Sequence, residues 1–451
     1  MTAAFLAAAA LAVVAACRRL WLIANVGAAY KAKVLCSALF GSGRAVDPAA
    51  ADEVSAEAYR ILRPFRAVID QNRQTVTVSL RGCCQRRAIH RSGLGATLEI
   101  VPIAPMGPTG LPIPGAFTVP WPEGEAPAGP EPAALSRVFD EAFLEPDARK
   151  PRRTRAVFVA ANGRLLGERY APGFSASTPL PGWSMAKAVL SALIGVLVGD
   201  GRLSLARSRL LAEWSAPGDP RARISLEDLL RMRSGLRFAE IYSNPLSDVV
   251  QMLFARPDAA RYAASRPLDR APGEEWRYAS GTTNILSLIA RRALGDDYAG
   301  FPRRALFNPL GMASAVLEPD ASGTFVGSSF MLASARDWAR FGQLYARHGI
   351  WQGKPLLPLG WTAFSAKPTP QSPGECYGAH WWLKLPKELG GESAAASRLP
   401  ADAMHALGHE GQCLSVIPSR GIVVVRLGLS IRIDAWDHAA FLASVINALG
   451  A

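Results

Sequence analysis

The sequence predicts an α+β fold in which both ends of residues 151–451 form one antiparallel sheet, flanked by helices, with an all-helical insert. Strand-like runs stand at the start and near the end of this region, and helical runs fill its middle. The first two strand-like runs flank Asn162-Gly163, which is typical of a hairpin with a type I′ turn.

The elements of this region follow in chain order. The strands of the first hairpin are expected over 155–160 and 164–170. An apolar helix over 184–198 ends at a Gly-Asp-Gly sequence, and a serine caps the next helix, over 225–232. The remaining expected elements are helices over 248–254, 282–294, 333–347 and 436–449, and strands over 412–417 and 422–427.

The composition indicates a globular protein with a large core. Of 451 residues 49% are hydrophobic, and the net charge is +13. The basic residues are scattered and form no nucleic-acid-binding pattern, so nucleic acid is not an expected partner. His405 and His409 have the spacing of metal ligands on a helix, but Gly408 and Gly411 argue against a helix there. We therefore expect neither a metal nor another cofactor.

The N-terminus is apolar enough to meet a membrane. Residues 2–17 carry no charge; Arg18 and Arg19 follow, and then comes a second uncharged run, 20–30. The first run is shorter than the roughly 20 residues of a full span and lacks a preceding positive charge. Residues 1–30 are interpreted as a signal or membrane anchor, the alternative being an alanine-rich helix packed on the body. This favours the cell envelope, periplasmic or membrane-anchored, over the cytoplasm.

Residues 31–150 are interpreted as an irregular N-terminal extension and linker. Short strands are expected over 75–80 and 96–100, and the Pro-, Gly- and Ala-rich stretch 101–134 is expected to be a linker or a surface chain. The cysteines leave two disulfides open: Cys36 with Cys83 or Cys84, and Cys376 with Cys413. Free buried thiols are the alternative for the first of these.

The most informative stretch begins at Pro181-Gly182 and contains Ser184 and Lys187. The Pro-Gly pair stops a helix from starting earlier, so the serine falls in the first helical turn. Residues three apart share one face of a helix, and free N–H groups collect at its start. A serine with an amine neighbour and a free N–H suits acyl transfer through a covalent intermediate. Taken alone, the pattern is explained better by a capping serine with a solvated lysine, since capping serines are common.

Two further stretches carry chemistry. Tyr278 and Ser280 precede a helix, and an ammonium group at Lys187 would lower the tyrosine pKa by favouring the phenolate. Gly411 lets a ligand approach the start of a strand, where the Gln412 N–H would be a second oxyanion donor beside that of Ser184. His409, in the same stretch, is expected to bond the substrate or to set the charge near Tyr278.

Together these stretches resemble the Ser-x-x-Lys, Tyr-x-Asn/Ser and Lys/His-x-Gly motifs of the serine beta-lactamase and penicillin-binding superfamily. The pattern is most similar to the class C-like branch, and within it to 6-aminohexanoate-dimer hydrolases and beta-lactamase-like esterases. Leu229–Leu236, Pro309–Met312 and Ser334–Gly342 support the resemblance, which covers residues 154–450. It implies a beta-lactamase/transpeptidase-like fold for residues 151–451.

The resemblance also implies roles. Ser184 is the nucleophile, Lys187 its proton partner and Tyr278 the general base. Ser280 stands where the family usually has Asn, and His409 stands where it usually has Lys. The first departure removes an amide that contacts the acyl side chain, and the second removes a permanent cation that would hold a carboxylate.

Both departures favour an esterase or amidase over a beta-lactamase. Tyr242 resembles a substrate-contacting tyrosine of the 6-aminohexanoate-dimer hydrolases; a loop aromatic below a proline turn is the alternative. The expected function is hydrolysis of an ester or small amide through an acyl-enzyme on Ser184. The alternatives are a peptidoglycan D,D-peptidase or beta-lactamase, and a non-catalytic penicillin-binding or sensing module.

Overall fold

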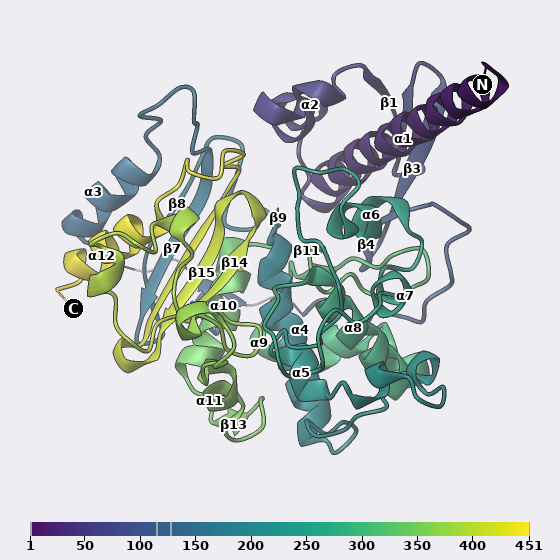
Figure 1. Cartoon of the computed structure of the whole chain (residues 1–451). Coiled ribbons are helices and arrows are strands. Elements are labelled where there is room, and N and C mark those ends of the chain that lie inside the picture. Colours follow the sequence, from purple (N-terminus) through teal and green to yellow (C-terminus); the bar gives the residue numbers. More distant parts are fainter. Residues whose placement is uncertain (1, 114–115, 127–128, 451) are drawn as a thin grey trace.

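The main sheet is antiparallel and unites distant parts of the chain. The computed structural model describes residues 2–113, 116–126 and 129–450 (Figure 1). Five strands follow the order β14-β15-β16-β7-β8, and the pairing of β16 with β7 closes the sheet, as predicted. Their bounds are Thr154–Ala161 (β7), Arg164–Tyr170 (β8), Met404–Gly408 (β14), Gln412–Ile417 (β15) and Ile422–Gly428 (β16). Asn162 and Gly163 both have positive φ, at 50° and 75°, which fits the predicted type I′ turn.

Helices cover both faces of this sheet, which explains why β7, β15 and β16 are apolar along their length. Phe158 belongs to one buried cluster with α10, whereas its neighbours Val157 and Val159 belong to a second cluster with α3 and α12. Figure 1 shows α3 and α12 on one side of the sheet and α10 on the other. The bounds are Ala133–Ala142 (α3), Ala335–Ala346 (α10) and His438–Ala448 (α12).

The insert between β8 and β14 is mostly helical. A capping box of Ser225 and Asp228 starts α5, as predicted from the serine. The insert also carries a small sheet of order β10-β11-β9, whose strands are too short to show a period in the sequence. The helices are Ala186–Gly199 (α4), Leu226–Leu230 (α5), Asp248–Ala255 (α6), Ala259–Ala264 (α7), Ser280–Leu294 (α8), Asn308–Leu310 (α9) and Trp361–Ala366 (α11). The short strands are Leu180–Pro181 (β9), Val316–Leu317 (β10), Met331–Ala333 (β11), Ile350–Trp351 (β12) and Lys354–Pro355 (β13).

The N-terminal extension is a folded unit. A long helix packs on a four-stranded antiparallel meander of order β1-β2-β3-β4, and on α6 of the insert. The expected strands over 75–80 and 96–100 are present as β2 and β4; β1 and β3 were missed because charged residues interrupt them. The elements are Thr2–Cys36 (α1), Val46–Ser55 (α2), Phe65–Asp70 (β1), Thr75–Leu80 (β2), Cys83–Arg91 (β3), Gly95–Leu98 (β4), Ala116–Pro120 (β5) and Gly124–Ala126 (β6). A 3₁₀ segment, Glu57–Leu62, joins α2 to β1.

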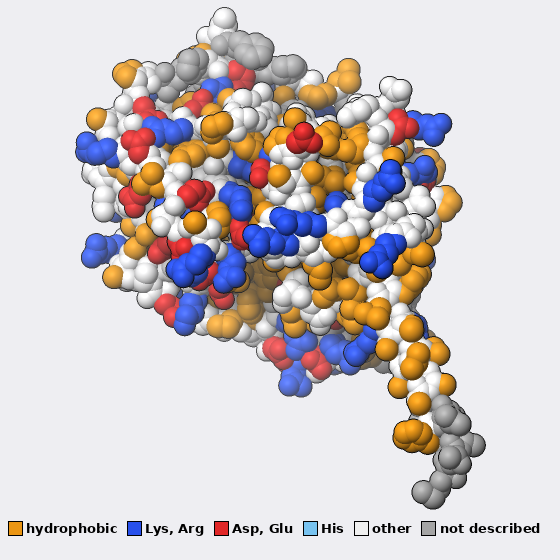
Figure 2. All heavy atoms as spheres, turned by 90° about the horizontal axis from the view of Figure 1, so that it is seen from above, with side chains coloured by type: hydrophobic (Ala, Val, Ile, Leu, Met, Phe, Trp, Pro, Cys, Tyr) orange, Lys and Arg blue, Asp and Glu red, His pale blue; other side chains and the backbone are white. Residues whose placement is uncertain are grey.

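The two halves of α1 have different surroundings. From Val26 onward it is largely buried against the body. Phe5, Leu11 and Trp21, in the first half, are 76%, 71% and 55% exposed. Figure 2 shows this half projecting from the body as an apolar rod. The helical run Ala9–Gly41 is long and apolar enough to cross a membrane, a test that signal sequences near an N-terminus also pass.

All six cysteines are free, so the two disulfides considered from the sequence are wrong. Cys36 is buried at the C-terminal end of α1, whereas Cys83 is exposed at the start of β3. Cys413 points into the buried cluster below the main sheet, while Cys376 lies half-exposed in a loop. The sequence shows neither the side of a strand on which a thiol falls nor which loop lies opposite.

Candidate active site

Ser184 lies on a 3₁₀ turn, Trp183–Met185, that leads directly into α4. The predicted placement at a helix start is therefore correct, with one tight turn before the regular helix. The Gly182 N–H donates to Met331 O at 2.9 Å, and a Cβ at Gly182 would stand 2.2 Å from the Trp338 ring. Trp183 has a φ of 48°, a costly conformation for a bulky residue. Close packing thus holds this turn in one shape.

Lys187 lies one turn further on and points at the serine, as its spacing predicted. Its Nζ donates to Ser184 Oγ at 2.8 Å, to Ser280 Oγ at 3.0 Å and to the Ser328 carbonyl at 3.0 Å. The residue is only 1% exposed. Burial lowers the pKa of Lys187 to about 8, against an opposing effect of the Glu240 charge. Near neutral pH a fraction of this amine is therefore neutral and has a lone pair to accept a proton.

Glu240 is a site residue that sequence reasoning missed. Its carboxylate accepts a hydrogen bond from Ser280 Oγ and a second, at 2.9 Å, from the Ser280 N–H. Desolvation raises the pKa of Glu240, while Lys187 and the Ser280 bonds lower it. A chain Lys187–Ser280–Glu240 therefore links the amine to a carboxylate. The only signal in the sequence is an acidic residue two positions before Tyr242.

Tyr278 lies beside this chain, with Lys187 Nζ 4.8 Å from its ring centroid. Burial raises the pKa of Tyr278 well above its usual value; the charges of Tyr377 and Glu240 add to this, and the Ser184 hydroxyl opposes it. The expectation that Lys187 would lower this pKa is wrong, because desolvation by burial outweighs the effect of a neighbouring amine. Tyr278 therefore stays a neutral phenol near physiological pH.

The hairpin end between β14 and β15 lies against the turn of Ser184. A Cβ at Gly408 would stand 2.1 Å from the Gly182 carbonyl, so a glycine is required at this contact. Gly411 has a φ of 79°, and its carbonyl accepts from Arg426 Nη1 at 2.9 Å. The group that closely approaches the backbone at Gly411, where a ligand was expected from the sequence, is thus the Arg426 guanidinium. Gln412 is fixed by two side-chain bonds to Gly428, at 2.7 Å and 3.0 Å.

His409 contacts Tyr242 instead of Tyr278. Its ring stacks on Tyr242 at 4.7 Å between centroids and meets Trp183 edge-on at 5.3 Å. Burial lowers the pKa of His409 to about 4, so the side chain is neutral at physiological pH. The expected charge-setting role near Tyr278 is therefore wrong. The neutral ring agrees with the expectation that a histidine in place of the family's lysine removes a permanent cation.

The Tyr242 hydroxyl lies among the hydroxyls of Ser184, Ser280 and Ser329. Among the described residues it has no hydrogen-bond partner of regular geometry. Burial raises the pKa of Tyr242, so it stays protonated. An unpaired buried hydroxyl beside Ser184 is suited to a substrate polar group.

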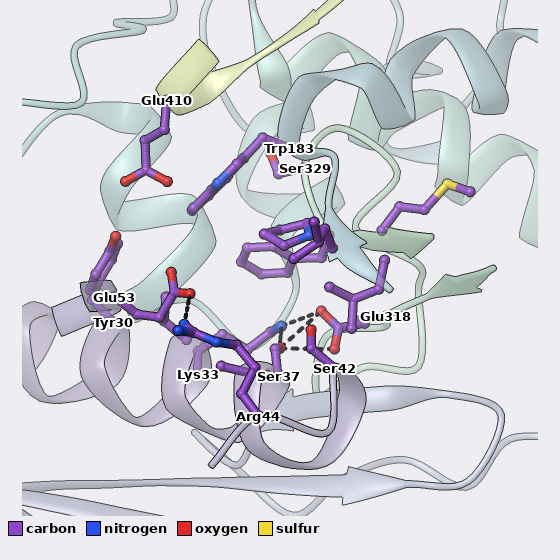
Figure 3. A pocket seen from close by; sticks show the side chains of 17 residues that line it. Tyr30, Lys33, Ser37, Ser42, Arg44, Glu53, Trp183, Glu318, Ser329 and Glu410 are labelled. Carbon is purple, nitrogen blue, oxygen red and sulfur yellow. Dashed lines mark hydrogen bonds and ion pairs between the residues drawn. The ribbon is translucent and has the colours of Figure 1, made fainter. Parts of the chain in front are cut away.

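The N-terminal extension is tied to the back of this site. Tyr59 OH donates to Glu410 Oε1 at 2.6 Å, Arg155 pairs with Glu53 at 2.8 Å, and Lys33 pairs with Glu318. Figure 3 shows four of these side chains, Lys33, Glu53, Glu318 and Glu410, around a small cavity between α1 and Trp183. Its volume of about 50 Å³ suits a water molecule and excludes a substrate.

The structure brings the predicted residues together. Ser184, Lys187 and Ser280 form one hydrogen-bonded group, with Tyr278 and Tyr242 beside it. Within the described part of the chain, no group of three or more His, Cys, Asp or Glu side chains is arranged to hold a metal ion.

This fold is that of the beta-lactamase/transpeptidase-like hydrolases. The chain belongs to the Beta-lactamase family, whose model matches residues 139–428. It is 23% identical over 219 residues to a 6-aminohexanoate-dimer hydrolase from Paenarthrobacter ureafaciens, a match covering 46% of this chain. The match spans 56% of that relative, little more than half of its length.

Solved structures show the same fold. A Bacillus anthracis protein assigned as a 6-aminohexanoate-dimer hydrolase has a TM-score of 0.56 and 22% identity, covering 77% of this chain and 88% of its own. A family VIII carboxylesterase has a TM-score of 0.53 and 14% identity, covering 72% and 98%. A penicillin-binding protein homologue from Caulobacter crescentus has a TM-score of 0.52 and 18% identity, covering 70% and 99%.

Proposed function

We propose that the protein is a serine hydrolase that cleaves an ester or a small amide through a covalent acyl-enzyme on Ser184. The observation that carries this proposal is the 2.8 Å hydrogen bond between Lys187 Nζ and Ser184 Oγ. Burial lowers the pKa of Lys187 to about 8, so its neutral form is accessible and can take the serine proton.

In the proposed reaction, Ser184 Oγ attacks the carbonyl carbon while its proton passes to Lys187. The carbonyl electron pair moves onto oxygen, and the N–H groups of Ser184 and Gln412 are assigned as its donors. The C–O or C–N bond then breaks, and the leaving alcohol or amine takes the proton held by Lys187. Water then attacks the acyl carbon and gives a proton to the neutral Lys187, which passes it to Ser184 Oγ as the acid leaves.

Lys187 takes the general-base role that the resemblance gave to Tyr278. A phenol whose pKa is raised stays protonated, so Tyr278 is assigned to donate a hydrogen bond to the leaving group. Ser280 and Glu240 connect to the same amine and are assigned to set its charge. Tyr242, whose hydroxyl is unpaired among the described residues, is assigned to bind the substrate.

The site favours uncharged substrates. His409, whose pKa is lowered to about 4, offers no cation to a substrate carboxylate. The relatives described as a 6-aminohexanoate-dimer hydrolase and a carboxylesterase support an amide or ester. A D,D-peptidase or beta-lactamase would gain from a fixed positive charge at this position.

A substrate panel tests this proposal. Purified protein and its Ser184→Ala variant are assayed with p-nitrophenyl esters, 6-aminohexanoate dimer, D-Ala-D-Ala peptides and nitrocefin. We expect turnover of an ester or the dimer by the wild type alone. Nitrocefin turnover at beta-lactamase rates would contradict the role given to His409, and fluorescent penicillin labelling without any turnover would point to the sensing module.

We also propose that α1 attaches the protein to a membrane. Its first half exposes Phe5, Leu11 and Trp21, and Arg18 and Arg19 follow the uncharged run. In water such a segment leaves its apolar side chains exposed, which is unfavourable. A bilayer would cover these side chains. The envelope is the proposed location; protease protection of a C-terminal tag would distinguish it from the cytoplasmic face.

A further inference from the structure

A second cavity, of about 450 Å³, lies between the N-terminal extension and the site. This volume falls within the range of ~300–1,000 Å³ that is usual for small-molecule sites. Val26 of α1 and Leu62 line one wall, and Val250 and Phe254 of α6 line another. Of the described residues that line it, none is Lys, Arg, Asp or Glu. The cavity is therefore suited to an apolar group.

The cavity reaches the residues that surround the nucleophile. Trp183, Tyr242 and His409 form its inner wall. Trp183 precedes Ser184 in the chain, and the Tyr242 hydroxyl lies beside the Ser184 hydroxyl. A substrate whose carbonyl carbon meets Ser184 can thus extend past these aromatic rings into the cavity.

The outer wall is fixed in place. Lys31 Nζ donates to the carbonyls of Leu62 and Phe65 at 3.0 Å and 2.7 Å, which ties the segment before β1 to α1. A Cβ at Gly27 would stand 2.8 Å from the Phe65 ring, so α1 packs closely on this segment. The bond from Tyr59 to Glu410 joins the same segment to the hairpin of His409. Because these bonds and contacts hold the walls in place, small shifts of the chain do not close the cavity.

We propose that this cavity holds a long aliphatic or acyl chain of the substrate, so that the protein acts on long-chain esters or amides. The inference rests on the proposed function, because it assigns a substrate class to the same serine. Trp21, exposed at the edge of the projecting half of α1, lies two residues from Ile23 of the cavity wall. The chain can come from a bilayer or from solution, and the experiment separates the two sources.

The test compares the rates at which fluorophosphonates with an ethyl or a dodecyl chain label Ser184. In this reaction Ser184 Oγ bonds to phosphorus, the P–F bond breaks, fluoride leaves and the serine proton passes to Lys187. Because each buried methylene contributes about fourfold, burial of four or more of them should make the dodecyl probe react more than about a hundredfold faster. Probes are kept below their micelle-forming concentrations.

Two variants fill the cavity, and a third is the matched control. Ile431→Trp places a large ring in the cavity from a half-exposed loop, and Val250→Phe does so from α6. Both are expected to reduce the dodecyl-to-ethyl ratio to near one. Ile433→Trp adds the same ring two residues further on, at a position that is 71% exposed, and should keep the wild-type ratio. Thermal unfolding confirms that each variant is folded.

The outcomes separate the two proposals. Equal rates for both probes with the wild type, or an unchanged ratio in folded Ile431→Trp and Val250→Phe, would overturn the cavity assignment while leaving the nucleophile intact. Failure of both probes to label would overturn the proposed function itself. Hydrolysis of p-nitrophenyl dodecanoate is then measured free and in phosphatidylglycerol vesicles. Faster turnover in vesicles that is lost without residues 2–21 assigns the bilayer as the source, and equal turnover assigns solution.

Discussion

Two apolar helices, α4 and α1, have opposite surroundings. α4 is buried along most of its 14 residues, because α8, the segment Arg303–Phe307 and Trp361 of α11 cover it. The first half of α1 exposes large apolar side chains to the outside. Similar composition thus gives a core helix where other elements cover it, and an exposed apolar segment where none of the described residues does.

Each helix also buries a lysine, and the partners differ. Lys33 of α1 contacts the Glu318 carboxylate directly and forms a structural ion pair. Lys187 of α4 contacts only hydroxyl and carbonyl oxygens, with Glu240 one hydrogen bond further away. Because no carboxylate bonds Lys187 directly, burial lowers the pKa of this lysine. The two lysines thus differ in their partners, an ion pair for Lys33 and neutral oxygens for Lys187.

Removing either lysine tests this difference with the largest effects. Lys187→Met should lower kcat/KM for an ester by about 10²–10⁴-fold, because the serine loses its base. Lys33→Met leaves Glu318 buried without a partner, which should cost about 3–5 kcal/mol of stability. Activity assays and urea unfolding measure both. Loss of activity in folded Lys33→Met, with Lys187→Met still active, would reverse the assignment.

Glu240→Gln tests the distant carboxylate. Losing a charged partner of Ser280 should lower kcat/KM by roughly 10–100-fold, since hydrogen bonds to charged groups contribute about 1.5–3 kcal/mol. Because the Glu240 charge raises the pKa of Lys187, its removal should also shift the rising limb of the pH–rate profile to lower pH. An unshifted limb would show that another group sets the charge of this amine.

The pH–rate profile of the wild type gives a smaller effect. Burial lowers the pKa of Lys187 to about 8, and only the neutral amine accepts the serine proton. Therefore kcat/KM should rise about tenfold per unit below that pKa and level off above it. A profile that is flat across this range, or that falls as the pH rises through it, would exclude Lys187 as the base.

Removing residues 2–21 tests the exposed half of α1 and should change activity least. The deletion leaves the buried half in place, so hydrolysis of p-nitrophenyl acetate should stay within about twofold, as for other changes away from packed contacts. The protein should move from the membrane fraction to the soluble fraction on centrifugation. Wild-type protein found wholly in the soluble fraction would contradict membrane attachment.

The sequence predicted features that depend on neighbouring residues. The i,i+3 spacing placed Lys187 beside Ser184, Ser225 marked a helix cap, and Asn162-Gly163 marked a hairpin. The order of strands and helices was enough to predict the closed main sheet. Strand-like runs stand at the two ends of residues 151–451 with helices between them, so the strands of the two ends are expected to pair with each other.

Features that depend on distant contacts were missed. Glu240 reaches Ser280 across 40 positions, and no local pattern marks it. The wall that α1 adds to the site depends on packing between the extension and α6. The pKa of Tyr278 was predicted with the wrong sign because burial, which the sequence does not show, outweighs the charge of a neighbour.

The central claim is that Ser184 accepts the acyl group. The most direct measurement is mass spectrometry of peptides after reaction with an ethyl fluorophosphonate. We predict one adduct, on the peptide that contains Ser184, and none in the Ser184→Ala variant. An adduct on another residue, or equal labelling of that variant, would contradict the account.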